Sequence, residues 1–427
     1  MTTARLPDVE AGIRFLDDLF ADAPLERVSL RFWEGTAWPD ERPRPATIVL
    51  RHPGALRAMF APQSERGLAE AYLRDDFDIV GDIEAAFEVA DALDARHTPN
   101  WRAALTSLLR LHRLPAPRGR DGGRAFAGDD GRRHSVDRDR RAVTFHYDVS
   151  NEFFGLWLDR RLVYSCAYFE APEDDLDTAQ AAKLDLLCRK LRLQPGQRVL
   201  DIGCGWGGFA IHAAGEWGAT VTGITLSRPQ ADLAAARARE AGLDGRAVFE
   251  VRDYRSLPES DTYDAIVSVG MSEHVGAERL ADYFRTASRH LKPGGVFLNH
   301  AIGEGASPRH RFGASFVDAY VFPDGEIPPV PAVLRAAEAA GLEVRDVENL
   351  RDHYAITLRH WVRRLEASHE AALAFVDEST YRVWRLYMAG SAHGFARGRL
   401  AVYQALLSKP EAGGDARLPL TRRDWYE

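Results

Sequence analysis

The chain has 427 residues, of which 45% are hydrophobic and 28% are charged, enough apolar material for about two to three globular domains. The formal net charge of -8 lacks the positive field typical of nucleic-acid-binding proteins, so no nucleic-acid partner is expected. The three cysteines, Cys166, Cys188 and Cys204, include no CxxC pair, which argues against a disulfide framework or a structural metal site and favours a reducing compartment.

Residues 1–112 are predicted to form a small α+β domain. An amphipathic helical pattern covers 9–20, strand-like runs cover 27–33 and 46–52, and a second helical pattern covers 82–97. The N-terminus has no basic segment followed by an apolar one, and no stretch of about eighteen apolar residues occurs in the chain. We therefore expect a cytoplasmic protein whose contact with a membrane is peripheral.

Residues 113–141 are rich in Gly, Pro, Arg and Asp and contain almost no aliphatic side chains to bury. This composition predicts a flexible linker. The remaining residues, 142–427, form the second predicted domain. Short apolar runs at 197–203, 220–226, 247–253, 263–270 and 295–301 alternate with helical patterns. Such alternation predicts an α/β fold of Rossmann-like type, a mostly parallel sheet with helices on both faces.

A glycine-rich segment follows the first strand of this domain. Gly203, Gly205 and Gly208 match GxGxxG between a strand and a helix, so a dinucleotide is formally allowed. Two features disfavour NAD: Asp201 lies in the approach to the loop, and the second strand ends without an acid to bind a ribose diol. Glycines let the backbone approach a smaller cationic ligand, and Asp201 favours its positive charge. S-adenosylmethionine is such a ligand.

The third strand ends at Asp253 and Tyr254, which suit an adenine amine and a stacked ring. An Asp that only caps a turn is the alternative for Asp253.

Seven ordered blocks carry a family resemblance: "FHYDVSNEFFGLWLD", "YSCAYFE", "LDIGCGWGG", "GITLSRPQ", "MSEHVG", "LKPGGVFLNHAIG" and "YVFPDGEIP". Together they resemble the cyclopropane-fatty-acyl-phospholipid synthase family and the related mycolic acid methyltransferases. The resemblance covers residues 142 to the end and extends more loosely to "GLAEAYLRDDFDI" at 67–79. It implies a class I methyltransferase fold, S-adenosylmethionine as methyl donor, and an alkene in a lipid acyl chain as acceptor.

The resemblance also implies roles for individual residues. Its cofactor positions fall on Tyr164, Ser165, Gly203, Cys204, Gly205, Thr225, Leu226, Ser227 and Gln230. Its bicarbonate site falls on Cys166, Glu273, His300, Ile302 and Tyr354. The segment "YSCAYF" is expected to cover the sulfonium like a lid.

The proposed chemistry explains why these residue types are needed. An alkene is a poor nucleophile, so methyl transfer requires a site that keeps water from the developing carbocation. Aromatic faces stabilise a cation without trapping it, and the candidates, each of which has plain core packing as the alternative, are Tyr147, Phe169, Tyr320 and Tyr387. A captured bicarbonate would then accept a proton, with His300 and Tyr354 as its donors and Glu273 as a proton acceptor. The adjacent His274 is expected to be structural, and Cys166 has no paired base that would make it a nucleophile.

The favoured product is a cyclopropane fatty acyl chain on a phospholipid, and a 10-methylene chain made from an oleoyl phospholipid is the alternative. A methyltransferase for soluble small molecules and a catalytically inactive lipid-binding module are more remote readings. The expected partners are unsaturated acyl chains at the inner face of the cell membrane and a second copy of the chain, since members of the resembled family are often dimers.

Overall fold

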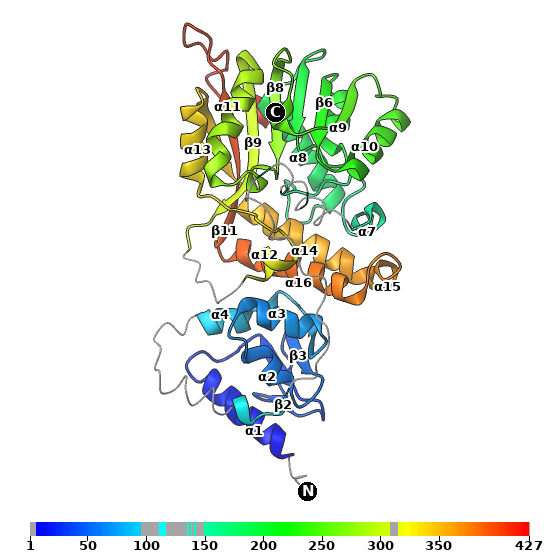
Figure 1. The fold of residues 1–427 in the computed structure, drawn as a ribbon, viewed down its shortest axis with the longest axis vertical. Helices are drawn as coiled ribbons and strands as arrows, with labels where there is room; N and C mark the ends of the chain where they lie inside the picture. The colour runs from blue at the N-terminus through cyan, green and yellow to red at the C-terminus, as the bar shows by residue number, and fades with distance from the viewer. Residues whose placement is uncertain are drawn as a thin grey trace. The chain divides into compact units, whose positions relative to one another are not determined.

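The computed structural model describes residues 6–94, 111–116, 135, 138, 141, 149–307 and 315–426. They group into two compact units (Figure 1). The smaller unit takes residues up to 126 together with 309–323 and 376–393, and the larger takes 127–308, 324–375 and 394–427. Most of the predicted linker lies outside the described residues, so the boundaries at 112 and 141 stay predictions.

The smaller unit contains a four-stranded sheet in the order β2-β1-β3-β4. The strands are β1 (Val28–Arg31), β2 (Ala37–Trp38), β3 (Ala46–Leu50) and β4 (Phe77–Gly81). Alternate residues of β3 are buried, as expected for a strand with one face on a core. The helices are α1 (Pro7–Leu19), α2 (Ala55–Phe60), α3 (Glu65–Leu73) and α4 (Glu88–Asp94). The predicted α+β character is confirmed.

Two later segments belong to this unit, α12 (Phe316–Tyr320) and most of α16 (Glu378–Ala396). Arg382 donates to the backbone oxygen of Tyr72 at 2.8 Å, and Arg385 donates to the Tyr72 hydroxyl at 2.8 Å. His393 lies 2.9 Å from Asp91. These contacts join segments more than three hundred residues apart, which no local sequence pattern indicates.

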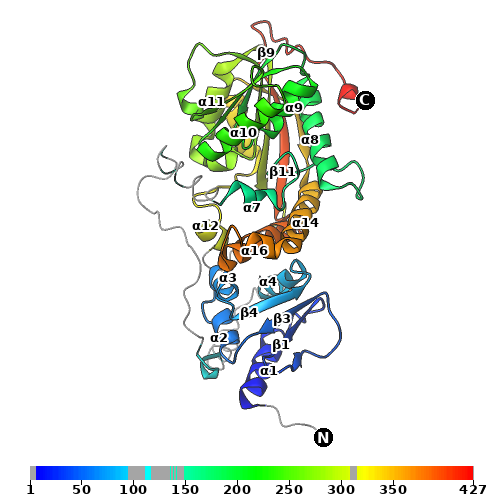
Figure 2. The same cartoon turned by 90° about the vertical axis from the view of Figure 1, so that its right-hand side faces the viewer.

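The larger unit is built on a seven-stranded sheet in the order β10-β11-β9-β8-β5-β6-β7. Its strands are β5 (Arg198–Ile202), β6 (Thr220–Thr225), β7 (Ala247–Val251), β8 (Tyr263–Val269), β9 (Leu291–Glu304), β10 (Glu343–Asn349) and β11 (Leu400–Ser408). The strands from β5 to β9 pair in parallel, and each was predicted. The sequence patterns did not identify β10 and β11, which add antiparallel pairings beyond β9 (Figure 2).

Helices cover both faces of this sheet. The larger unit contains the helices α7 (Asn151–Gly155), α8 (Leu176–Leu191), α9 (Gly208–Glu216), α10 (Arg228–Glu240), α11 (Leu280–His290), α13 (Val330–Ala339), α14 (Arg351–Ala367) and α15 (His369–Ala372). Val199 packs into a core with α8 and α9, while the next residue, Leu200, packs into a core with α11 and α13. Figure 1 shows these two helix groups on opposite sides of the strands. The parallel strands end at one edge of the sheet, where the loops after β5, β6, β7 and β8 meet.

Candidate active site

The loop between β5 and α9 requires glycine at specific positions. Gly203 and Gly207 adopt φ values of +82° and +80°, in the left-handed region that side chains disfavour. A Cβ on Gly207 would also lie 2.7 Å from the ring of Phe249. The backbone can therefore turn tightly from β5 into α9 and leave open space above the loop.

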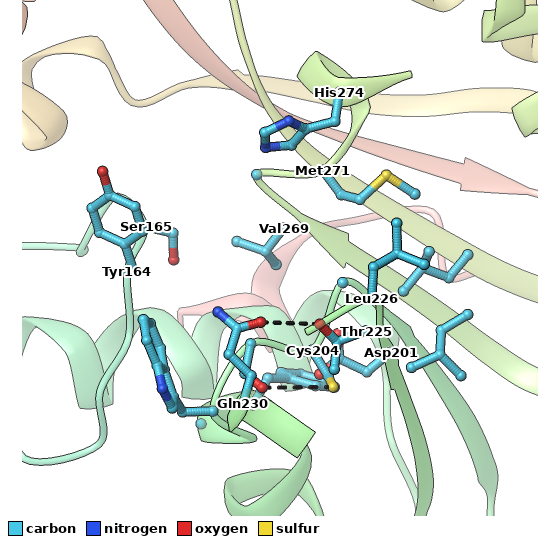
Figure 3. Close-up of a pocket in the computed structure, with 18 of the residues that line it drawn as sticks. Tyr164, Ser165, Asp201, Cys204, Thr225, Leu226, Gln230, Val269, Met271 and His274 are labelled. Atoms are coloured by element: carbon cyan, nitrogen blue, oxygen red, sulfur yellow. Dashed lines mark hydrogen bonds between the residues drawn. The ribbon is translucent and has the colours of Figure 1, made fainter. Parts of the chain in front are cut away.

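That space is a pocket with about 1170 Å³ of atom-free volume, counting its open mouth. Figure 3 shows Tyr164 and Ser165 on one side of it and Leu226 on the other, with Met271 and His274 along its edge. All predicted cofactor residues except Ser227 line the pocket: Tyr164, Ser165, Asp201, Gly203, Cys204, Gly205, Thr225, Leu226, Gln230, Asp253 and Tyr254. Their placement around one cavity is compatible with a nucleoside-sized ligand, and their individual roles stay predictions.

Asp201 is the buried carboxylate of the pocket. Only 2% of the residue is exposed, and its Oδ2 has no hydrogen-bond partner among the described residues. Burial raises the pKa of the Asp201 carboxyl to about 7, against the opposing attraction of the Lys183 ammonium. Lys183 is 1% exposed and donates to the Ser165 hydroxyl at 3.0 Å. Burial lowers the pKa of Lys183 to about 8. One buried lysine thus connects the segment at Tyr164 to the carboxylate at the end of β5.

The end of β6 forms a hydrogen-bonded turn. The Thr225 hydroxyl donates to Gln230 Oε1 at 3.0 Å (Figure 3). Ser227 caps α10, because its hydroxyl accepts from the Gln230 backbone N–H at 3.4 Å. Ser227 is therefore placed to shape the turn, while Thr225 and Gln230 face the pocket.

Asp253 caps the short turn after β7 and also lines the pocket. Its Oδ1 accepts from the backbone N–H of Arg255 at 2.9 Å, and its Oδ2 lies 2.7 Å from the Arg255 guanidinium. Tyr254 packs edge-on against Tyr283. Both uses considered for Asp253, in the turn and in the pocket, are compatible with this position.

An aromatic cluster lies behind Tyr164. Its ring packs against Trp361 at 5.2 Å and against Trp157 at 5.5 Å between ring centroids. Phe154 joins the cluster to Trp206, whose indole nitrogen donates to the Asn151 side chain at 2.7 Å. These contacts hold the start of the "YSCAYF" segment, and the remaining aromatic residues of that segment are absent from the pocket lining.

The roles of the four predicted cation-stabilising rings stay predictions, and three of these rings belong to the described residues. Phe169 stacks on His353 and His360. Tyr320 and Tyr387 belong to the smaller unit, and Tyr147 lies outside the described residues.

Four of the five predicted bicarbonate-site residues, Cys166, Glu273, Ile302 and Tyr354, are linked through hydrogen bonds and strand pairing that involve Val402 and Leu350. Glu273 Oε1 accepts from the Ile302 backbone N–H at 2.7 Å. Ile302 pairs with Val402 on β11, and the backbone oxygen of Val402 accepts from Leu350. The Leu350 carbonyl in turn receives the Cys166 thiol at 3.7 Å and the Tyr354 backbone N–H at 3.1 Å. His300 lies two residues before Ile302 on β9.

Two polar atoms of this cluster are buried without a hydrogen-bond partner among the described residues, Glu273 Oε2 and His300 Nε2. Burial raises the pKa of Glu273 to about 7 and lowers the pKa of His300 well below its usual value. Burial also raises the pKa of the Cys166 thiol, which makes a thiolate nucleophile unfavourable. His274 next to Glu273 lines the cofactor pocket.

Comparison with known proteins identifies the family. The model for the family described as mycolic acid cyclopropane synthetase matches residues 134–405. The chain belongs to this family. A probable fatty acid methyltransferase of Pseudomonas putida is 41% identical over 401 residues, which cover 93% of this chain and 95% of that protein. The cyclopropane-fatty-acyl-phospholipid synthase of Escherichia coli K12 is 37% identical over 269 residues, 63% of this chain and 68% of that protein. The tuberculostearic acid methyltransferase of Mycobacterium tuberculosis H37Rv is 33% identical over 392 residues, 88% of this chain and 86% of that protein.

Solved structures agree with this assignment. The cyclopropane synthase MmaA2 from Mycobacterium tuberculosis superposes with a TM-score of 0.61 at 34% identity, over 63% of this chain and 97% of that one. The mycolic acid cyclopropane synthase CmaA1, complexed with SAH and CTAB, superposes with a TM-score of 0.59 at 36% identity, also over 63% of this chain and 97% of that one. The expected class I fold is confirmed, and this mycolic acid cyclopropane synthetase family member is an S-adenosylmethionine-dependent methyltransferase.

Sequence reasoning missed three buried polar residues around the family site: Lys183, Lys190 and Gln404. Each is at most 1% exposed. Leu176, Gln180, Lys183, Leu187 and Lys190 are all buried at helical spacing in α8, so both lysines share its inward face. That periodicity was the available signal. Among the described residues, no helix is both long and apolar enough to cross a bilayer.

Proposed function

We propose that this enzyme transfers the methyl group of S-adenosylmethionine to the double bond of an unsaturated phospholipid acyl chain and forms a cyclopropane. The observation that carries the proposal is the pair of buried, unpartnered atoms Glu273 Oε2 and His300 Nε2 next to the cofactor pocket's strands. A simple methyl transfer to a heteroatom requires no such pair of buried polar atoms. The cyclopropane synthases among the relatives and solved structures support the same reaction class.

The residues fit a small oxyanion such as bicarbonate. A carboxyl with a pKa near 7 and a neutral imidazole offer an acceptor and a donor, and one atom of each, Glu273 Oε2 and His300 Nε2, lacks a hydrogen-bond partner in the described part of the chain. Bound bicarbonate would supply the base that takes the proton after methyl transfer. Within this proposal, Glu273 holds the hydroxyl of the anion, and His300 and Tyr354 donate to its oxygens.

The protein's own part in methyl transfer is to exclude water and to position the reactants. Trp157, Trp361 and Phe154 support Tyr164 at the pocket wall. Such a rigid aromatic wall keeps water from a developing cation and favours its charge. The buried Cys166 thiol adds bulk and a weak donor to the Leu350 carbonyl, and it takes no covalent part.

Formation of a 10-methylene chain is the second candidate. Its support is the similarity to the tuberculostearic acid methyltransferase and the presence of Ser272 beside Glu273. Ser272 is 2% exposed, and its hydroxyl has no hydrogen-bond partner among the described residues. A small buried side chain here leaves room for a shifted acyl chain, and a shift of about 1 Å is enough to change which proton is lost.

We further propose that the enzyme meets its acceptor at the inner face of the cell membrane as a peripheral protein. Basic residues near residue 135 are the sequence feature that supports this, because they attract anionic lipid at about 1 kcal/mol each. Homodimer formation, implied by the family resemblance, belongs to the same proposal.

Incubation of the purified protein with S-adenosylmethionine and dioleoyl phosphatidylglycerol vesicles tests the function. Mass analysis should detect acyl chains heavier by one CH₂. A ring and an exocyclic methylene have the same mass, so proton NMR separates them: high-field ring protons support the cyclopropane, and vinylidene protons support the second candidate. Donor binding without any lipid product would contradict both and favour a small-molecule acceptor or an inactive binding module.

A further inference from the structure

We propose that Lys190 and Gln404 act as positioning residues that fix the tautomer of His300, so that its buried Nε2 carries the hydrogen and can donate it to a bound anion. The inference deepens the proposed anion site and rests on that function for its catalytic consequence. The tautomer itself can be tested without any activity measurement.

The first step is the orientation of the Gln404 amide. Lys190, from α8, contacts the carboxylate of Glu348 on β10 and lies 2.7 Å from Gln404 Oε1 on β11. An ammonium group has donors and no acceptor, so only the oxygen of the amide can face it. The Gln404 NH₂ group must therefore point away from Lys190. This orientation follows from donor and acceptor chemistry and not from an assumed amide rotamer.

The second step uses the orientation of the Gln404 amide to identify which imidazole nitrogen of His300 accepts a hydrogen bond. Gln404 pairs with His300 across the β11 and β9 strands, and its Nε2 lies 3.2 Å from His300 Nδ1. Because the amide nitrogen can only donate, Nδ1 must accept. Burial keeps the ring neutral by lowering the pKa of His300. A neutral imidazole that accepts at Nδ1 carries its hydrogen at Nε2.

The third step concerns the hydrogen-bond partner of the hydrogen on His300 Nε2. His300 is 2% exposed, and its Nε2 has no hydrogen-bond partner among the described residues. A buried N–H without a partner is unfavourable, so such donors persist where a ligand accepts from them. The opposite tautomer would present a lone pair instead and would repel an anion. The relay from Lys190 through Gln404 thus selects the form of His300 that can hold an oxyanion.

Substitution of Gln404 by Glu reverses the relay with little change in shape. A carboxylate at 404 beside the Lys190 ammonium stays ionised and can only accept, so the hydrogen moves to Nδ1 of His300. Turnover with S-adenosylmethionine and dioleoyl phosphatidylglycerol vesicles should fall about 10² to 10³-fold, as for loss of one positioned donor. The affinity for S-adenosylmethionine should stay within about threefold of wild type, because Gln404 is not among the residues that line the cofactor pocket.

NMR of the full-length protein with ¹⁵N-labelled histidine reads the tautomer directly, with His300→Asn used to assign the signal. His290 supplies an internal reference of the opposite kind, because its Nδ1 lies 2.8 Å from the Asp261 backbone oxygen and must be protonated there. We expect His300 protonated at Nε2 in the wild type and at Nδ1 in Gln404→Glu. Lys190→Met releases the amide and should give both forms.

A wild-type His300 protonated at Nδ1, or a tautomer unchanged in Gln404→Glu, would overturn the relay. The wild-type spectrum alone decides this even if a variant fails to fold. A flipped tautomer with full turnover would leave the relay intact and overturn the anion-binding role of His300 in the proposed function. The two failures are therefore distinguishable.

Discussion

Replacement of Asp201 by Asn should stabilise the ligand-free protein by an amount that grows with pH. Burial raises the pKa of Asp201 from 3.8 to about 7, so the folded state holds a proton that the unfolded chain has lost. A raised folded-state pKa gives stability that is complete below pH 3.8 and is lost as pH rises toward 7. At about 1.4 kcal/mol per pKa unit, the full loss is about 4 kcal/mol, of which about 3 kcal/mol falls between pH 5 and pH 8.

Urea unfolding at pH 5, 6, 7 and 8 without donor measures this. The difference in unfolding free energy between Asp201→Asn and wild type should widen by about 3 kcal/mol across the series. Asp244→Asn is the matched control, because Asp244 is exposed and its substitution should leave the pH dependence unchanged. Parallel curves for Asp201→Asn and wild type would show that burial does not hold a proton on this carboxyl.

Binding of S-adenosylmethionine should displace the proton that Asp201 holds in the ligand-free protein. The positive sulfonium favours ionised Asp201, so S-adenosylmethionine binding to wild type should release protons near pH 6 and strengthen as pH rises toward 7. Titration calorimetry in buffers with different ionisation enthalpies detects the release. The Asn variant should bind more weakly, with less proton release.

The remaining predictions concern the residues Glu273 and His300, the glycine loop between β5 and α9, and membrane attachment. Glu273→Gln and His300→Ala should keep donor affinity and lose about 10² to 10⁴-fold in turnover; near-wild-type rates would contradict their assignment. Gly207→Ala should destabilise the enzyme by about 1 to 3 kcal/mol through backbone strain and the Phe249 contact. Gly215→Ala, inside the helix that Gly207 precedes, should be neutral or stabilising by up to about 1 kcal/mol, and unfolding measurements compare the two variants. Glutamine substitutions in the full-length chain at Arg132, Arg133 and Arg140 should weaken sedimentation with anionic vesicles by up to about 10²-fold and leave the affinity for S-adenosylmethionine unchanged. Unchanged sedimentation would count against membrane attachment through these residues.

The sequence was most informative where a short motif coincides with a strand end. Gly203 and Asp253 follow β5 and β7, Thr225 ends β6, and parallel strands bring such positions to one edge of a sheet. Strand and helix patterns therefore brought the glycine loop, Asp201, Asp253 and Tyr254 to one pocket. The family resemblance supplied the other predicted cofactor residues: Tyr164, Ser165, Cys204, Thr225, Leu226, Ser227 and Gln230. The family blocks added Glu273 and His300, which no local pattern would distinguish from ordinary buried polar residues.

Pairings between distant strands were beyond those patterns. Gln404 meets His300 only because β11 inserts antiparallel between β9 and β10, and a strand near the end of the chain gives no local sign of its neighbours. Similarly, Lys190 was not singled out from the sequence, because its partners Glu348 and Gln404 lie more than one hundred and fifty residues away. Tertiary contacts of this kind determine which buried polar groups around His300 already have a hydrogen-bond partner within the protein.

The pocket at Asp201 and the buried polar site at Glu273 and His300 differ in the charge that they favour in a ligand. At Asp201 the unpartnered atom is a carboxylate oxygen, which favours a cation, and the nearby Lys183 only partly offsets its charge. At His300 the unpartnered atom is a ring nitrogen that the relay leaves as a donor, which favours an acceptor. A sulfonium beside Asp201 and an oxyanion beside His300 would each offset the desolvation cost of a buried polar atom. Each ligand should therefore stabilise the fold, and methyl transfer, which consumes the sulfonium charge, returns Asp201 to the state in which it favours a proton. Loss of that charge weakens the hold on the spent cofactor, so the same buried carboxylate that attracts the donor also favours release of the product.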